Sequence, residues 1–143
     1  LSKALHKAFE KKPCRHVLTR QRITATAGIK RGEAAMPHAE IKHSADLTID
    51  ASAILAEIET VILEHDARAG ACKGRAYPAE QYHHSHIAIT VALLTKPHRD
   101  EAFSRALLSA LERRIKALIS EPCEFSLGLS YSTPFYVTNR HTP

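Results

Sequence analysis

The hydrophobic periodicity of this sequence constrains its fold most, because at two places along the chain the two-residue repeat of a strand is followed by the 3.6-residue repeat of a helix. The strand-like segments span 37–44, 72–77, 86–94 and 125–131, and the helical apolar stripes span 54–62 and 103–118. The order is therefore strand, helix, strand, twice over, in two similar halves. We expect an α+β fold in which two βαβ units form one four-stranded sheet with both helices on one face.

Local signals add detail to these elements. Thr48 or Asp50 can cap the first helix, which we expect to end near Gly70, and Asp100 lies in the first turn of the second helix. The run 86–94 is β-branched and mostly apolar, which predicts a strand buried on both faces. Helices on one side leave the other face of the sheet bare, and we expect oligomerisation to cover that face.

The positive charge of the chain is concentrated in its first quarter. Residues 1–35 hold nine Lys and Arg against two acidic residues, whereas residues 36–143 hold eleven against thirteen. The apolar residues of 20–35 are mostly Ala, which bury too little area to offset the cost of ordering the chain. We therefore expect 1–35 to be a weakly ordered basic extension and 36–143 to be one domain.

Composition also excludes several classes of protein. The longest apolar run, residues 87–94, is far shorter than the roughly 20 residues of a membrane span, so we expect no membrane partner. Three cysteines without a CxxC pair do not make a disulfide framework, which favours a cytoplasmic location. Phe9 is the single aromatic residue of the basic extension, so base stacking and hence nucleic-acid binding are not expected.

Three histidines crowd the start of the third strand, at His83, His84 and His86. Crowded imidazoles are typical of metal sites, but no acidic partner follows them at the spacing of a metal ligand. We therefore predict no metal site.

The order of short motifs gives a family resemblance. The features that carry it are Met36-Pro37-His38 before a strand, the double βαβ pattern, the basic segment Cys72-Lys73-Gly74-Arg75, and the closing residues Pro134, Phe135, Asn139 and His141. On these features residues 36–143 resemble the 5-carboxymethyl-2-hydroxymuconate isomerase family of the tautomerase superfamily. The resemblance implies a homotrimeric isomerase of aromatic catabolism that uses no cofactor and has an N-terminal proline as its base. Its substrate would be an unsaturated 2-hydroxy or 2-oxo acid with two or three carboxylates.

Pro37 is the residue on which this activity depends, and it is internal in the sequence. The nitrogen of a peptide bond has no basic lone pair, so the proline must first become the N-terminal residue. Either the active chain starts at Met36 and loses that methionine, or the extension is retained and the protein is catalytically silent. We expect the first, because the extension differs in composition from the domain.

A substrate with several carboxylates needs cations near the proline. The resemblance implies an arginine on the second strand, where Arg75 is the closest candidate and Lys73 lies at nearly the same place. Arg99, just before the second helix, is a further candidate for substrate binding, with an ordinary surface charge as the alternative. His38 follows Pro37 and is expected at the mouth of the pocket or against the next subunit.

A second functional class remains open at this point. In this alternative, the chain is a non-catalytic oligomeric protein whose basic arm, residues 1–35, binds nucleic acid or another anionic surface. The two classes differ in whether residues 1–35 belong to the mature protein.

Overall fold

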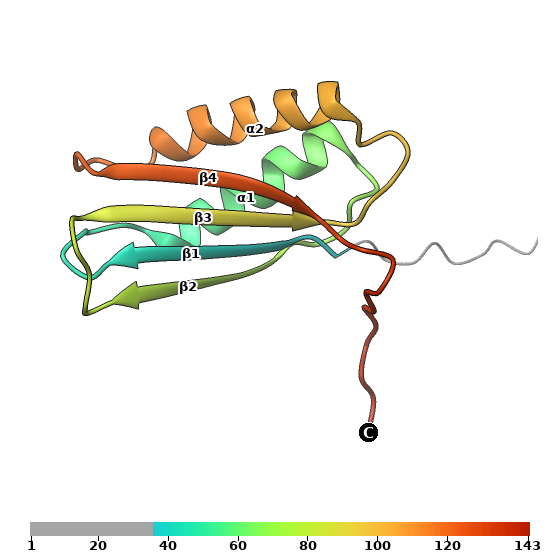
Figure 1. The fold of residues 1–143 in the computed structure, drawn as a ribbon, viewed down its shortest axis with the longest axis horizontal. Helices are drawn as coiled ribbons and strands as arrows, with labels where there is room; N and C mark the ends of the chain where they lie inside the picture. The colour runs from blue at the N-terminus through green and yellow to red at the C-terminus, as the bar shows by residue number, and fades with distance from the viewer. Residues whose placement is uncertain (1–35) are drawn as a thin grey trace, which may run out of the picture.

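The computed structural model describes residues 36–143, and the predicted basic extension lies outside the described residues. Six elements follow one another in the predicted order, as Figure 1 shows. They are β1 (His38–Ser44), α1 (Ala51–His65), β2 (Lys73–Ala79), β3 (His86–Leu93), α2 (Glu101–Lys116) and β4 (Glu124–Tyr131).

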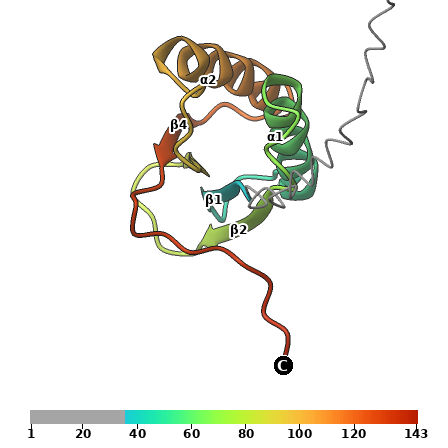
Figure 2. The ribbon, with the colours of Figure 1, turned by 90° about the vertical axis from the view of Figure 1, so that its right-hand side faces the viewer.

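The strands form one mixed sheet in the order β2-β1-β3-β4. β1 pairs with β2 in parallel, β3 pairs with β4 in parallel, and the two units join through the antiparallel pair of β1 and β3. Both helices lie on the same side of the sheet, as the two views in Figures 1 and 2 show. The α+β architecture of two βαβ units is therefore confirmed.

The two units repeat one contact at their starts. The amide of Lys73 at the start of β2 donates to the carbonyl of Pro37, just before β1, at 2.8 Å. The amide of Glu124 at the start of β4 donates to the carbonyl of Ser85, just before β3, at 3.2 Å. Because β1 and β3 run antiparallel, Pro37 and Ser85 occupy equivalent positions at opposite ends of the sheet.

The core lies between the sheet and the two helices and consists mainly of branched aliphatic side chains. The largest fully buried members are Ile41, Ile54, Ile58, Val61, Ile62, Ile87, Ile89, Val91, Leu107, Leu111 and Ile115. They come from β1, α1, β3 and α2, so the described residues contain a complete core of their own. Burial of this apolar area is the main stabilising contribution to the fold.

β3 corrects the prediction of a strand buried on both faces. Its helix-facing residues, such as Ile89 and Val91, are buried, whereas His86 and Thr90 on the other face are exposed. The prediction was wrong for the single chain because both helices cover the same face. The opposite face of the sheet is therefore bare, as the order of elements predicted.

The helix ends show which local signals decide the boundaries. Asp50, one of the two predicted caps, accepts a hydrogen bond from the amide of Ala53 at 2.9 Å, and Asp100 does the same for α2. α1 ends at His65 rather than near Gly70. The amide of Asp66 still donates to the carbonyl of Ile62, and residues 66–69 then form a turn.

Within residues 36–143, neither helix has the length and apolar character to cross a lipid bilayer.

Candidate functional site

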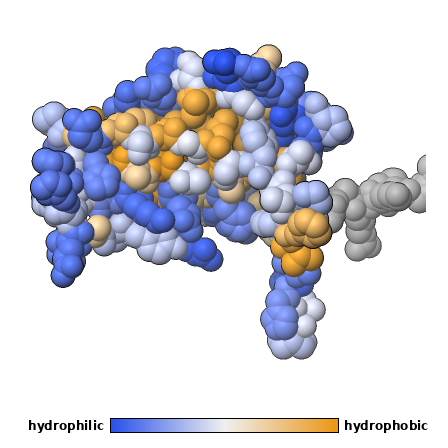
Figure 3. Space-filling view, viewed as in Figure 1, coloured by the Kyte–Doolittle hydropathy of each residue, from blue (hydrophilic) through white to orange (hydrophobic). Residues whose placement is uncertain are grey.

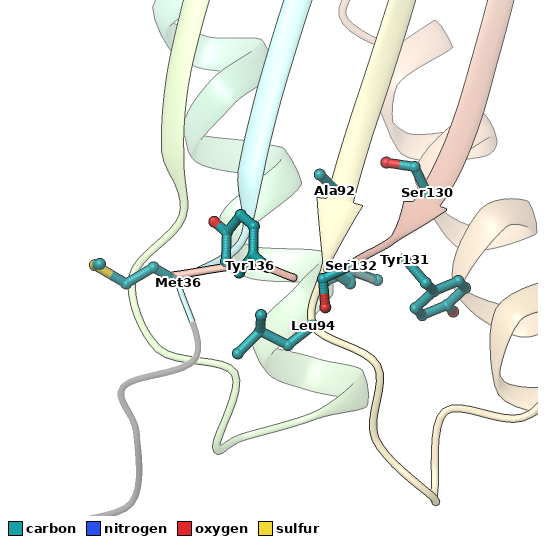
Figure 4. Close-up of a pocket in the computed structure, with 8 residues that line it drawn as sticks. Met36, Ala92, Leu94, Ser130, Tyr131, Ser132 and Tyr136 are labelled. Atoms are coloured by element: carbon teal, nitrogen blue, oxygen red, sulfur yellow. The ribbon is translucent and has the colours of Figure 1, made fainter. Parts of the chain in front are cut away.

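A cavity of about 210 Å³ lies where the amino end of β1 meets the carboxyl ends of β3 and β4. The C-terminal segment passes over it and contributes Tyr136 (Figure 4). The residues that line it come from three segments far apart in sequence, namely Met36, Ala92, Leu93, Leu94, Ser130, Tyr131, Ser132 and Tyr136. Their side chains are mainly apolar, with four hydroxyl groups among them.

Pro37 follows a lining residue in the chain but is not itself among the residues that line this cavity. Met36, whose carbonyl carbon is bonded to the Pro37 nitrogen, is one of the lining residues (Figure 4). The pyrrolidine ring itself is fully buried, and the carbonyl of Pro37 is held by the amide of Lys73. The candidate base is thus fixed just before β1, and the residue bonded to its nitrogen lines the cavity.

Strand pairing places a row of four residues beside the proline. Lys73, His38, Ala92 and Ser130 are successive partners across β2, β1, β3 and β4. Paired residues project from the same face of a sheet, and neighbouring strands are about 4.8 Å apart, so the row crosses the bare face. Ala92 and Ser130 line the cavity, whereas Lys73 lies two strands away.

The second expected cation lies one row further from the proline. Arg75 pairs with Glu40, which in turn pairs with Thr90, and Arg75 is exposed. Glu40 is an acidic neighbour on the same face, and its carboxylate lies 3.8 Å from the ammonium of Lys42. Of the two expected cations, Lys73 is therefore the nearer to Pro37 in the register of the sheet.

Arg99 has a partner inside the protein. Its guanidinium is fully buried, and its Nη2 lies 2.7 Å from Oδ2 of Asp66, to which Nε also donates at 3.1 Å. Its Nη1 donates to the carbonyl of Leu94 at 2.7 Å. The structure therefore does not bear out the alternative of an ordinary surface charge, and it ties Arg99 to the backbone of a cavity residue.

Asp66 keeps its charge in this buried setting. Burial by itself raises the pKa of a carboxyl, but hydrogen bonds from His98 and Arg99 outweigh that effect and hold the pKa of Asp66 well below its usual range. The His98 imidazole lies 2.9 Å from the same oxygen. The ion pair thus joins the end of α1 to the segment before α2.

The three histidines lie at the opposite end of the sheet from Pro37. His83, His84 and His86 share a hollow of about 340 Å³ with Glu124, and the rings of His83 and His84 lie 4.0 Å apart. Among residues 36–143, no group of three or more His, Cys, Asp or Glu side chains is arranged to hold a metal ion.

Several cavity residues carry no sequence signal. Leu94, Ser130 and Ser132 belong to no motif, and only the pairing of β3 with β4 brings them together. The hydroxyl of Tyr131 lies 2.5 Å from Oγ of Ser104 on α2, and Tyr136 lines the cavity.

Comparison with known proteins gives matches in structure and none in sequence. The chain matches no protein-family model and no curated protein. A 5-carboxymethyl-2-hydroxymuconate isomerase from Deinococcus radiodurans R1 superposes with a TM-score of 0.61, at 16% identity over 76% of this chain and 92% of that chain. A second structure, described as a 5-carboxymethyl-2-hydroxymuconate delta-isomerase, gives 0.57 at 17% identity, over 77% of this chain and 90% of that one.

A third similar solved structure is that of an assembly. It is described as a fused 4-OT wild-type symmetric trimer, and it gives a TM-score of 0.52 at 14% identity, over 66% of this chain and 85% of that chain. At these identities the likeness extends to the fold alone. Residues 36–143 therefore have the fold of the tautomerase superfamily, as the resemblance predicted.

Proposed function

We propose that this protein is a cofactor-independent isomerase that moves a proton within an unsaturated 2-hydroxy or 2-oxo acid, with Pro37 as the base. The observation that carries the proposal is the position of Met36. Met36 is one of the residues that line the cavity, and its carbonyl carbon is bonded to the Pro37 nitrogen. The fold shared with structures described as isomerases supports the same reaction class.

The reaction requires that the chain begin at Pro37 in its active form. A free secondary amine has a lone pair, which the amide nitrogen of the Met36–Pro37 bond lacks. The amine takes the proton from the 2-hydroxyl of a dienol, the oxygen becomes a carbonyl, the double bonds shift, and the ammonium returns the proton to the distal carbon. The substrate and product are isomers, so no redox partner is needed.

The surroundings of Pro37 favour a neutral amine. An apolar cavity and nearby cations both disfavour the protonated form, which lowers the pKa of an amine toward neutrality. Lys73 and Arg75 are the cations that we propose for the substrate carboxylate, and His38, in the same row as Lys73, is proposed to position the substrate. We leave Arg99 out of the binding set because its guanidinium is buried against Asp66.

We also propose that the protein assembles as a homotrimer. β4 is an edge strand of the sheet, and an apolar area lies on the side of the molecule where α2 runs above β4 (Figure 3). Phe135 and Val137 of the C-terminal segment are 96% and 83% exposed. Exposed apolar area of this kind marks interaction surfaces. A trimer predicts about three times the chain mass in light scattering, and a monomer at micromolar concentration would contradict the proposal.

A cytoplasmic location fits the state of the described cysteines. Cys72 and Cys123 are both free thiols, which is typical of proteins from reducing compartments. The basic extension, on which the alternative of an anion-binding arm depends, lies outside the described residues.

The activity is tested with two versions of the protein. One is the 143-residue chain, and the other starts at Met36 and has lost that methionine, as checked by intact mass. We expect the shorter version to remove the ultraviolet absorbance of a 2-hydroxydienoic acid and the longer version to leave it nearly unchanged. Equal rates from both versions, with both masses intact, would exclude a proline base.

A proline substitution in the shorter version isolates the residue. Pro37→Ala keeps an N-terminal amine but replaces the rigid secondary amine with a primary one, so we expect the rate to fall without vanishing. Pro97→Ala, at an exposed proline of a loop, is the matched control and should retain the full rate. Melting curves of all versions check that the fold is unchanged.

A further inference from the structure

The corner between β3 and α2, residues 94–99, forms part of the cavity wall and is tied to the end of α1. Leu94, at the start of the corner, lines the cavity, and Arg99, at its end, is buried against Asp66. We propose that Asp66 is a positioning residue of the site, which acts through Arg99 to hold Leu94 in a fixed place relative to Pro37. The proposal rests on the isomerase function proposed above, because that function makes Pro37 the base.

The first step of the argument is the orientation of the Arg99 guanidinium. Its Nε and Nη2 both donate to Oδ2 of Asp66, at 3.1 and 2.7 Å, and its Nη1 donates to the carbonyl of Leu94 at 2.7 Å. A guanidinium is planar, so fixing two of its nitrogens also fixes the direction of the third. The position of the Asp66 carboxylate therefore determines where the Leu94 carbonyl is held.

The Asp66 carboxylate is itself held by neighbouring groups. Its other oxygen, Oδ1, accepts a hydrogen bond from the amide of Arg68 at 3.1 Å, and Oδ2 also accepts one from the His98 imidazole at 2.9 Å. The backbone carbonyl of Asp66 accepts a hydrogen bond from the amide of Ala69 at 2.8 Å. The backbone and the side chain of Asp66 are thus both fixed in the turn that follows α1.

The same turn leads to the contact that holds Pro37. Residues 66–72 connect α1 to β2, and the amide of Lys73, the first residue of β2, donates to the carbonyl of Pro37 at 2.8 Å. The amide of Cys72 donates to Oε2 of Glu59 on α1 at 2.6 Å, which anchors the second end of the turn. One short segment is therefore connected to the candidate base at one end and, through the buried ion pair, to the cavity wall at the other.

A second set of hydrogen bonds fixes the corner to the end of β4. The amide of Thr95 donates to Oγ of Ser132 at 3.1 Å, its hydroxyl donates to the carbonyl of Ser132 at 2.6 Å, and the amide of Ser132 donates to the carbonyl of Leu93 at 2.9 Å. Leu93, Leu94 and Ser132 all line the cavity (Figure 4). A shift of Leu94 would therefore displace several wall residues, and a misplacement of about 1 Å can slow a reaction about a hundredfold.

A double variant separates positioning from stability. Asp66→Leu with Arg99→Met replaces the buried pair by apolar side chains, which should restore most of the stability, but it leaves no donor for the Leu94 carbonyl. In the shorter version of the chain, at a temperature well below the melting point, we expect kcat for the 2-hydroxydienoic acid to fall at least about tenfold. A purely structural pair predicts that the rate recovers together with the melting temperature, and that result would overturn the proposal.

A single variant keeps the proposal testable if the double variant does not fold. Arg99→Lys retains a positive charge beside Asp66, but an ammonium cannot replace the planar fork that reaches the carboxylate and the Leu94 carbonyl together. It should also lower kcat at least about tenfold, and a full rate would overturn the proposal. Glu101→Leu with Arg105→Met makes the matched exchange at an exposed ion pair of α2 and should retain the full rate.

Amide hydrogen exchange of the 143-residue chain tests the same link without catalysis. In the double variant the amides of Thr95 and Ser132 should exchange at least about tenfold faster, whereas the amide of Ile89, in the middle of β3, should change only with the global stability. If these amides respond and the shorter version shows no turnover, the proposed function is wrong and the link from Asp66 to the cavity wall is supported. If the shorter version is active and neither its rate nor these amides respond, the function is retained and the positioning role is excluded.

Discussion

Replacing Asp66 with Asn should destabilise the fold more than removal of any surface carboxylate. The side chain of Asp66 is 5% exposed and that of Arg99 is 0% exposed, with 2.7 Å between the carboxylate oxygen and the nearest guanidinium nitrogen. An amide keeps the shape of the carboxylate but carries no charge. The variant therefore leaves the Arg99 guanidinium buried without a counter-ion.

The size of the effect follows from that burial. Removing one partner of a buried ion pair typically costs about 3–5 kcal/mol in the free energy of unfolding. For a domain of this length, each kcal/mol of lost stability lowers the melting temperature by about 4 °C, so we expect a decrease of roughly 10–20 °C. The matched control is Glu101→Gln, which removes the pair with Arg105, in which both side chains are 78% exposed. That change should cost no more than about 1 kcal/mol.

Thermal and urea unfolding followed by circular dichroism measure the difference. A double variant, Asp66→Leu with Arg99→Met, should recover most of the lost stability, because a buried pair can be replaced by apolar groups at little cost. If Asp66→Asn and Glu101→Gln lower the melting temperature equally, the pair does not contribute as a buried charge.

The same pair predicts a dependence on pH. The pKa of Asp66 is lowered in the folded protein, so its contribution is fully present above the unfolded value of about 3.9 and is lost as the pH falls through the folded value. The difference in unfolding free energy between the wild type and Asp66→Asn should be constant from about pH 5 to 8 and shrink below about pH 4. A difference that grows on acidification would contradict the assignment.

Three further predictions concern β2 and the segment before it. A Cβ added at Gly74 would lie 2.4 Å from a terminal methyl of Leu55. Gly74→Ala should therefore lower the free energy of unfolding, measured with a chemical denaturant, by about 1–3 kcal/mol. Leu55→Ala should reduce that penalty in the double variant. Burial raises the pKa of Cys72 to about 11, so its thiol should react with iodoacetamide at pH 8 far more slowly than a free cysteine, and a rate equal to that of free cysteine would refute this. Lys73→Ala and Arg75→Ala should each raise KM or lower kcat by about tenfold to several hundredfold, which is the range for loss of a charged hydrogen bond. Unchanged steady-state constants in both variants would show that β2 does not contribute to the site.

Local chemistry made much of the fold predictable. Alternating residues gave β1 and β4, and Asp50 and Asp100 marked the two helix starts because their carboxylates accept amide hydrogen bonds at those positions. The end of α1 was misplaced because a glycine was taken as the stop. The chain leaves the helix at Asp66, whose side chain bonds to His98 and Arg99, more than 30 residues away.

The site was less predictable than the fold. Pro37 could be proposed from its place before the first strand, but the cavity beside it needs the register that pairs Ala92 with Ser130. Arg99 was picked out for its charge, yet its role depends on burial and on a carboxylate that pattern analysis does not connect to it. Residue type is visible in a sequence, whereas the partner of a residue is set by tertiary packing.

The backbone hydrogen bonds at the starts of the two units place Pro37 and Ser85 at equivalent positions, but only one of these residues can become an N-terminal amine. Ser85 stands where the second unit would have its own proline, and its nitrogen joins it to His84 in the middle of the polypeptide. Freeing that nitrogen would cut the protein into two pieces, so the second unit can never supply an amine of its own. The loop before β3, which contains the three histidines, therefore does not have to hold a reactive nitrogen in place as the start of β1 does. Insertions and substitutions should accumulate there first, while the sheet keeps its shape.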